Sequence, residues 1–136
     1  MAAKDRMSVL TAMMTQSVIP VFYHPDVELC INVIQACANA GAKCVEFTNR
    51  GDFASHVFYA LTRHFAQADP SVIMGVGSIV DAPTAGLYIA NGAKFVVSPL
   101  TSVETAKLCN RRGIPYSPGC GSATEIGDAQ ELGCEI

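Results

Sequence analysis

The sequence predicts an α/β fold built on a parallel sheet. Half of the 136 residues are apolar while only 15% are charged, and short apolar runs alternate with amphipathic stretches. The runs begin 19 to 28 residues apart, which suits strand–helix–strand units and is too long for hairpins. Strands of such a sheet are covered on both faces, so their apolar residues are consecutive instead of alternating with polar ones.

Five strands and six helices are expected from this pattern. The strands are expected at residues 18–23, Cys44–Thr48, 72–76, 95–98 and, more weakly, 114–117. Helices are expected at residues 6–15, 26–41, 52–66 and 81–92, and two more are expected to open at Thr101 and Ser122. Asp26 and Asp81 are suited to N-capping, and capping boxes begin at Thr101 and Ser122. Pro83 fits the first turn of the helix capped by Asp81.

Two connections in the chain share one pattern. Residues 39–45 and 90–96 both run from a helix end through Gly, Ala and Lys into a strand. Repeated connections of equal geometry favour a (β/α)8 barrel, of which residues 1–136 would supply about five βα units as one domain. An open flavodoxin-like sheet also accommodates five strands. Against that alternative, no glycine-rich phosphate loop follows the first strand.

The composition argues against several classes of partner. The net charge is −3 and no basic block occurs, so nucleic acid is not expected as a partner. No apolar run reaches the roughly 18 residues of a membrane span, and no signal peptide is evident. The six cysteines form no C-x-x-C pair, so we expect reduced thiols, a cytoplasmic location and no metal site.

The residues at the carboxyl ends of the strands are the candidate site, because ligands of α/β folds gather there. Glu46 stands inside the apolar strand Cys44–Thr48, where burial would raise its pKa and suit it to general acid/base chemistry. The competing interpretation is a structural carboxylate paired with Arg50 or Lys43. Arg50 is a candidate for bidentate binding of a substrate carboxylate, or else a solvated loop residue.

A glycine-containing turn follows the third strand. Gly75 and Gly77 would let the backbone approach a ligand, and Ser78 offers a hydroxyl, although a tight turn explains the same residues. The three histidines, by contrast, suit surface or helix-capping positions better than a catalytic role.

Taken together, five short segments resemble the strand motifs of one known family. They are residues 19–21, 45–50, 75–78, 97–99 and 114–120. In order and spacing they are similar to the KHG/KDPG aldolases, the 4-hydroxy-2-oxoglutarate/2-dehydro-3-deoxy-6-phosphogluconate aldolases. The resemblance implies a (β/α)8 barrel, a homotrimer, and cleavage of a 2-keto-4-hydroxy acid to pyruvate plus an aldehyde. This class I chemistry proceeds through a Schiff base and needs neither metal nor cofactor.

The resemblance also implies roles for individual residues. Glu46 would act as the general acid/base, and Arg50 would bind the carboxylate of the keto acid. Ser78 would contact the bound keto acid, where the family often has threonine. The pocket would be completed by Pro99, near the carboxylate, and by the turn Pro118 and Gly119 at its mouth.

The lysine that forms the Schiff base is the point of departure from the family pattern. The family carries it on the sixth strand, and this sequence stops at Ile136, about where that strand would begin. The lysines present precede strands or lie on predicted helices; they are Lys4, Lys43, Lys94 and Lys107. We therefore expect this chain alone to be inactive. The alternative is a non-catalytic, barrel-derived module that self-associates.

Overall fold

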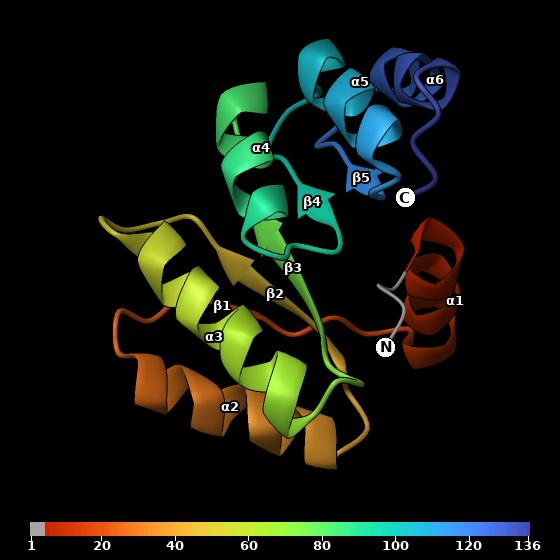
Figure 1. The fold of residues 1–136 in the computed structure, drawn as a ribbon. Coiled ribbons are helices and arrows are strands. Elements are labelled where there is room, and N and C mark those ends of the chain that lie inside the picture. The colour runs from red at the N-terminus through yellow and green to blue at the C-terminus, as the bar shows by residue number, and fades with distance from the viewer. Residues whose placement is uncertain (1–4) are drawn as a thin grey trace.

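Helices and strands alternate along residues 5–136, the part of the chain that the computed structural model describes (Figure 1). Their order is α1 (Arg6–Gln16), β1 (Val21–Phe22), α2 (Val27–Asn39), β2 (Cys44–Thr48), α3 (Ala54–Ala68), β3 (Ile73–Gly77), α4 (Ala82–Ala90), β4 (Val96–Val97), α5 (Val103–Arg112), β5 (Tyr116–Ser117) and α6 (Ala123–Glu131). The predicted alternation of strands and helices is confirmed.

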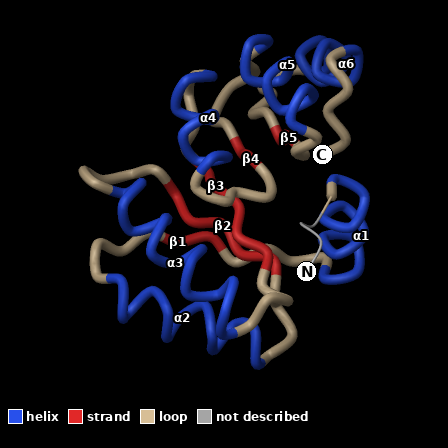
Figure 2. Tube along the Cα trace, viewed as in Figure 1, coloured by secondary structure: helices blue, strands red, loops and turns tan. Residues whose placement is uncertain are grey.

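The five strands form one parallel sheet in sequence order, β1-β2-β3-β4-β5. A flavodoxin-like sheet would place its second strand at the edge and its first strand inside, so the sequential order agrees with part of a barrel. Helices α2 to α5 follow one another around the outside of the strands, and α1 lies on the opposite side (Figure 2). No helix among residues 5–136 has the length and apolar character to cross a membrane.

Side chains alternate between the two faces of the sheet, as the strand repeat requires. One set packs beneath the outer helices in the main core and includes Val45, Phe47, Met74, Val76, Val96 and Tyr116. The other set faces the barrel interior and contacts α1; it consists of Cys44, Ile73 and Phe95, packed with Val9 and Met13. The interior is therefore apolar at the amino ends of the strands, and α1 covers it there.

Polar contacts hold α1 in this position. The Gln16 side chain bonds both backbone groups of Cys44, accepting from its amide at 2.8 Å and donating to its carbonyl at 2.9 Å. At the other end of the helix, Arg6 Nε forms an ion pair with Glu135 Oε1 at 2.6 Å. Arg6 also donates to the Asn110 side chain and to the Gly133 carbonyl. The segment after α6 is thereby tied to the first helix.

The ends of several elements differ from expectation. The first strand comprises Val21–Phe22 and not residues 18–23, although the Pro20 carbonyl still accepts from the Glu46 amide. Helix α3 begins at Ala54 and not at residue 52, because Phe53 adopts a left-handed conformation (φ 60°). Helix α5 is capped by Ser102 and not by Thr101.

The cap at Ser122, by contrast, is confirmed, since its hydroxyl accepts from the Glu125 amide at 3.3 Å. The Glu125 carboxylate returns to the amide of Gly121, one residue before the position that a capping box predicts. Asp26 and Asp81 cap α2 and α4 as expected, and Pro83 lies in the first turn of α4.

Gly75 offers a test of how tightly the interior layer packs. A Cβ atom at Gly75 would overlap the ring of Phe95. We expect Gly75→Ala to lower the free energy of unfolding by about 1–3 kcal/mol through overpacking, measured by chemical denaturation. The control is Gly127→Ala in α6, where a Cβ meets no atom within 4 Å; it should stabilise the chain by about 0.4–1 kcal/mol. Equal effects of the two substitutions would contradict this packing.

Candidate functional site

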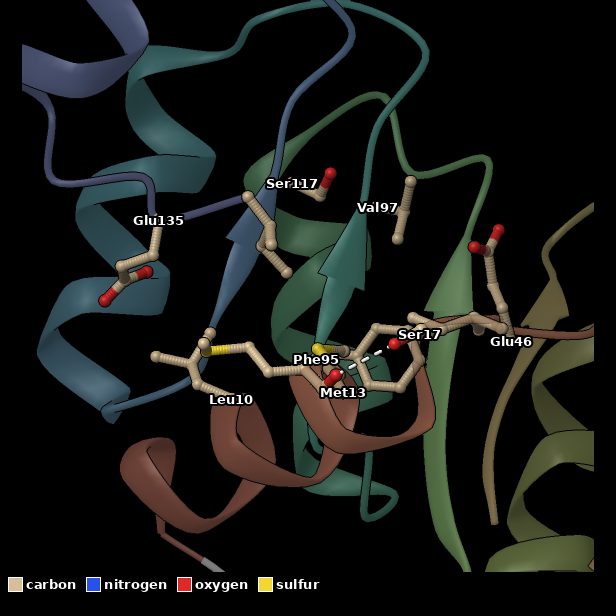
Figure 3. A pocket seen from close by; sticks show the side chains of 11 residues that line it. Leu10, Met13, Ser17, Glu46, Phe95, Val97, Ser117 and Glu135 are labelled. Carbon is tan, nitrogen blue, oxygen red and sulfur yellow. Dashed lines mark hydrogen bonds between the residues drawn. The ribbon is translucent and has the colours of Figure 1, made fainter. Parts of the chain in front are cut away.

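A cavity of about 420 Å³ lies on the inner face of the sheet. It is bounded by α1, β2, β4, β5 and the segment after α6, and its lining is mostly apolar. Figure 3 shows Leu10 and Met13 of α1 at its base, with Glu46 and Ser117 contributed by strands. An apolar pocket with a few polar groups is the usual form of a small-molecule site.

Glu46 owes its place in this cavity to the glycine on the neighbouring strand. It lies in the middle of β2, opposite Gly75 in the parallel register. Its carboxylate extends over Gly77, where a Cβ atom would overlap Oε1. A side chain at this position would force the carboxylate to move, so β3 and β2 build the Glu46 position together.

Burial raises the pKa of Glu46, and the positive charge of Arg50 lowers it to a lesser extent. The competing expectation of a structural ion pair is not met within residues 5–136, since Glu46 has no salt bridge within 4 Å there. Lys43 instead donates to the Ser71 hydroxyl at 2.7 Å. A half-buried carboxyl with a raised pKa binds its proton more tightly than a solvated one, which suits it to general acid/base chemistry.

Arg50 and Ser78 lie in the loops that follow β2 and β3. Arg50 is exposed, and its amide donates to the Thr48 carbonyl at 2.9 Å. Ser78 adopts a left-handed conformation with φ of 59°, which non-glycine residues reach at some energetic cost. The Asn49 amide bonds the Gly77 carbonyl, so the two loops share one edge of the sheet.

The three remaining predicted residues meet at the ends of β4 and β5. The backbone of Gly119 packs so closely on the Pro99 carbonyl that a Cβ atom there would overlap it. Thr101 reinforces the contact by donating from its hydroxyl to the Gly119 carbonyl at 3.2 Å. Pro118 precedes this glycine directly after β5. All six predicted residues therefore lie on the sheet or just beyond its carboxyl edge.

Some residues of the site were not predicted from sequence. Thr48 shares the inner face with Glu46 and is almost fully buried, and its hydroxyl has no protein partner among residues 5–136. The two-residue repeat of the strand puts Thr48 on the same face as Glu46, but no local sequence pattern indicated that it would be buried. Ser117 and Glu135 also line the cavity. No sequence pattern pointed to Glu135, because its position depends on the ion pair with the distant Arg6.

No described lysine lines this cavity. Lys43 directly precedes β2 and Lys94 lies two residues before β4, so both are at the amino edge of the sheet. Lys107 is exposed on α5. Lys4 lies outside the described residues. Residues 5–136 also contain no group of three or more His, Cys, Asp or Glu side chains placed to hold a metal ion.

The raised pKa of Glu46 predicts a pH-dependent effect of Glu46→Gln on stability. In the folded chain this pKa lies above its ordinary value of 4.5, so the folded state holds the proton more tightly and ionisation opposes folding. The stability of Glu46→Gln relative to the wild type should therefore rise from about pH 4 to about pH 7.

Chemical denaturation at both pH values measures this difference. Glu131→Gln, at an exposed position in the last turn of α6, is the control. A relative stability of Glu46→Gln that stays constant or falls with pH would contradict burial of the ionised group.

The sequence matches the KDPG and KHG aldolase family over residues 9–136. It is 34% identical over 119 residues to the 2-dehydro-3-deoxy-phosphogluconate aldolase of Treponema pallidum, covering 88% of this chain and 55% of that protein. The KHG/KDPG aldolase of Escherichia coli K12 is 25% identical, with 88% and 53% covered. The chain thus spans about half the length of these curated relatives.

Solved structures give the same picture. The KDPG aldolase of Legionella pneumophila, with pyruvate captured at low pH as a covalent carbinolamine intermediate, is 25% identical and superposes with a TM-score of 0.81. The match covers 96% of this chain and 60% of that one. The sequential parallel sheet with its outer helices is therefore the fold of these aldolases over the part that the chain spans. The family match over nearly the whole chain and this shared fold place the protein in the KDPG and KHG aldolase family.

Proposed function

We propose that the protein acts as a class I aldolase, cleaving a 2-keto-4-hydroxy acid to pyruvate and an aldehyde. Suitable substrates are 2-dehydro-3-deoxy-6-phosphogluconate and 4-hydroxy-2-oxoglutarate. The observation that carries the proposal is Glu46, whose half-buried carboxyl lies in the interior cavity over Gly77 with a raised pKa. A proton carrier in an apolar cavity, with Arg50 nearby, suits keto-acid chemistry.

In this proposal residues 1–136 form the N-terminal part of one barrel domain, and the amine comes from a strand beyond α6, next to β5. The neutral amine adds to the keto carbon, and Glu46 protonates the carbinolamine oxygen, which leaves as water. Glu46 then takes the proton of the C4 hydroxyl. The C3–C4 bond breaks, and its electron pair moves into the iminium to give an enamine. Protonation at C3 and hydrolysis release pyruvate.

The other site residues bind the substrate in this scheme. Arg50 would pair with the carboxylate of the keto acid, since its guanidinium is exposed and has no salt bridge within residues 5–136. Ser78 would contact the bound keto acid. Pro99 would line the pocket near the carboxylate, and Pro118 and Gly119 would shape its mouth; the close packing of Gly119 on Pro99 supports their placement together. We also propose a homotrimer that works in the cytoplasm.

A second candidate function is a non-catalytic module that self-associates. The observation in its favour is the open sheet, whose outermost strands within residues 5–136 are β1 and β5. Such an edge can pair with another chain as readily as with a further strand.

Borohydride trapping separates the two functions. The naturally expressed protein is treated with pyruvate and borohydride, and its intact mass is measured. We expect the mass to increase by one reduced pyruvyl group per chain, because borohydride reduces a Schiff base to a stable amine. Omitting pyruvate is the control. A protein that stays unmodified and assembles into stable oligomers would favour the non-catalytic module.

Glu46→Gln tests the acid/base role in the same protein. The amide cannot exchange a proton, so we expect turnover of the keto acid to fall by about 10²–10⁴-fold. The control, Glu131→Gln, should leave turnover unchanged. Wild-type turnover in the Glu46→Gln protein would refute the role of this carboxyl.

A further inference from the structure

The short segment that carries Arg50 is fixed by contacts from three directions. The Asn49 amide donates to the Gly77 carbonyl at 2.9 Å, which extends the β2–β3 ladder by one residue. The Asn49 side-chain oxygen accepts from the Tyr88 hydroxyl at 2.8 Å. Gly51 lies so close to the Tyr23 ring that a Cβ atom there would overlap it. Arg50 is thus held on both sides by its neighbours in sequence.

Tyr88 is a buried and closely packed member of these supports. It lies on α4 with 1% of its surface exposed, and its ring packs edge-on against Phe58 with centroids 5.1 Å apart. Burial raises the pKa of Tyr88 to about 12, with a smaller contribution from Tyr23. The phenol therefore stays protonated at neutral pH and can donate to Asn49. A locked ring fixes the position of its hydroxyl, and a buried hydroxyl needs such a partner.

In contrast, few contacts fix the position of the Arg50 side chain. It is exposed and has no salt bridge within residues 5–136. A long side chain without partners samples many rotamers, and ordering it on a ligand reduces affinity. The location of its backbone consequently decides where the guanidinium can meet a substrate carboxylate.

We infer that Tyr88 is a positioning residue for Arg50, acting through Asn49. The inference rests on the proposed function, in which Arg50 binds the carboxylate of the keto acid. The hydroxyl of Tyr88 holds the Asn49 side chain, and this holds the start of the loop in register with β3. Neither Tyr88 nor Asn49 needs to touch the substrate for this role.

The test is a kinetic comparison of variants of the naturally expressed protein. Tyr88→Phe removes only the hydroxyl, and we expect KM for the keto acid to rise about three- to tenfold with kcat changed less than twofold. Asn49→Ala removes the same hydrogen bond from its other end and should give a similar rise. The double variant should be no worse than the more affected single variant, because both lose one interaction. In an Arg50→Gln background, Tyr88→Phe should have no further effect.

The control is Tyr59→Phe on α3, whose exposed hydroxyl accepts from Arg63. It should leave both constants unchanged. An unchanged KM in Tyr88→Phe and Asn49→Ala would overturn the inference, as would a fall in kcat alone, which indicates a merely structural role. Should Tyr88→Phe fail to fold, Asn49→Ala and its Arg50→Gln combination decide the question. Failure of the wild type to cleave any keto acid would refute the proposed function itself, and the role of Tyr88 with it.

Discussion

On the inner face of β3, Ile73 is followed only by glycines, at positions 75 and 77. The interior of the molecule is arranged around the space that these glycines leave. Gly75 leaves room for the ring of Phe95, and Gly77 leaves room for the carboxylate of Glu46. The first space is filled by an apolar ring that packs with α1, whereas the second holds the ionisable group. One strand with two missing side chains therefore shapes both the interior packing and the site.

One face of the sheet forms the main core, and the other carries the candidate site. The residues of β2 that face the outer helices, Val45 and Phe47, are apolar and fully buried. Glu46 lies between them in sequence and faces the interior. A shift of one residue in the pairing of β2 would exchange these positions and bury the carboxylate beneath the helices. Preserving the register thus preserves both the core and the site.

The fold was largely predictable because its signals are local. The spacing of apolar runs located every strand, and short polar residues located the starts of α2, α4 and α6, since both signals depend on residues within a few positions of each other. The errors arose where backbone conformation or a distant partner decides the outcome. Phe53 takes a left-handed conformation that its residue type does not suggest. Ser102 caps α5 while the neighbouring Thr101 bonds a different strand end, at Gly119.

The candidate site shows the same division. Glu46 could be singled out from sequence because a charge inside an apolar strand conflicts with its surroundings, and the structure places it in the interior cavity. The hydrogen bond between Tyr88 and Asn49 joins residues 39 positions apart and leaves no local pattern. The same holds for the burial of Thr48. The roles of the six predicted residues remain predictions.

The ion pair between Arg6 and Glu135 has a consequence for the order of folding. The two residues are separated by 129 positions, so the contact can form only after nearly all of the intervening chain has been synthesised and collapsed. Closing so long a loop is entropically unfavourable until the sheet is already assembled. Helix α1 precedes the sheet in the chain, yet its anchorage at this end requires the segment after α6. During synthesis, the apolar amino ends of the strands thus depend on the other contacts of α1 to shield them from neighbouring chains.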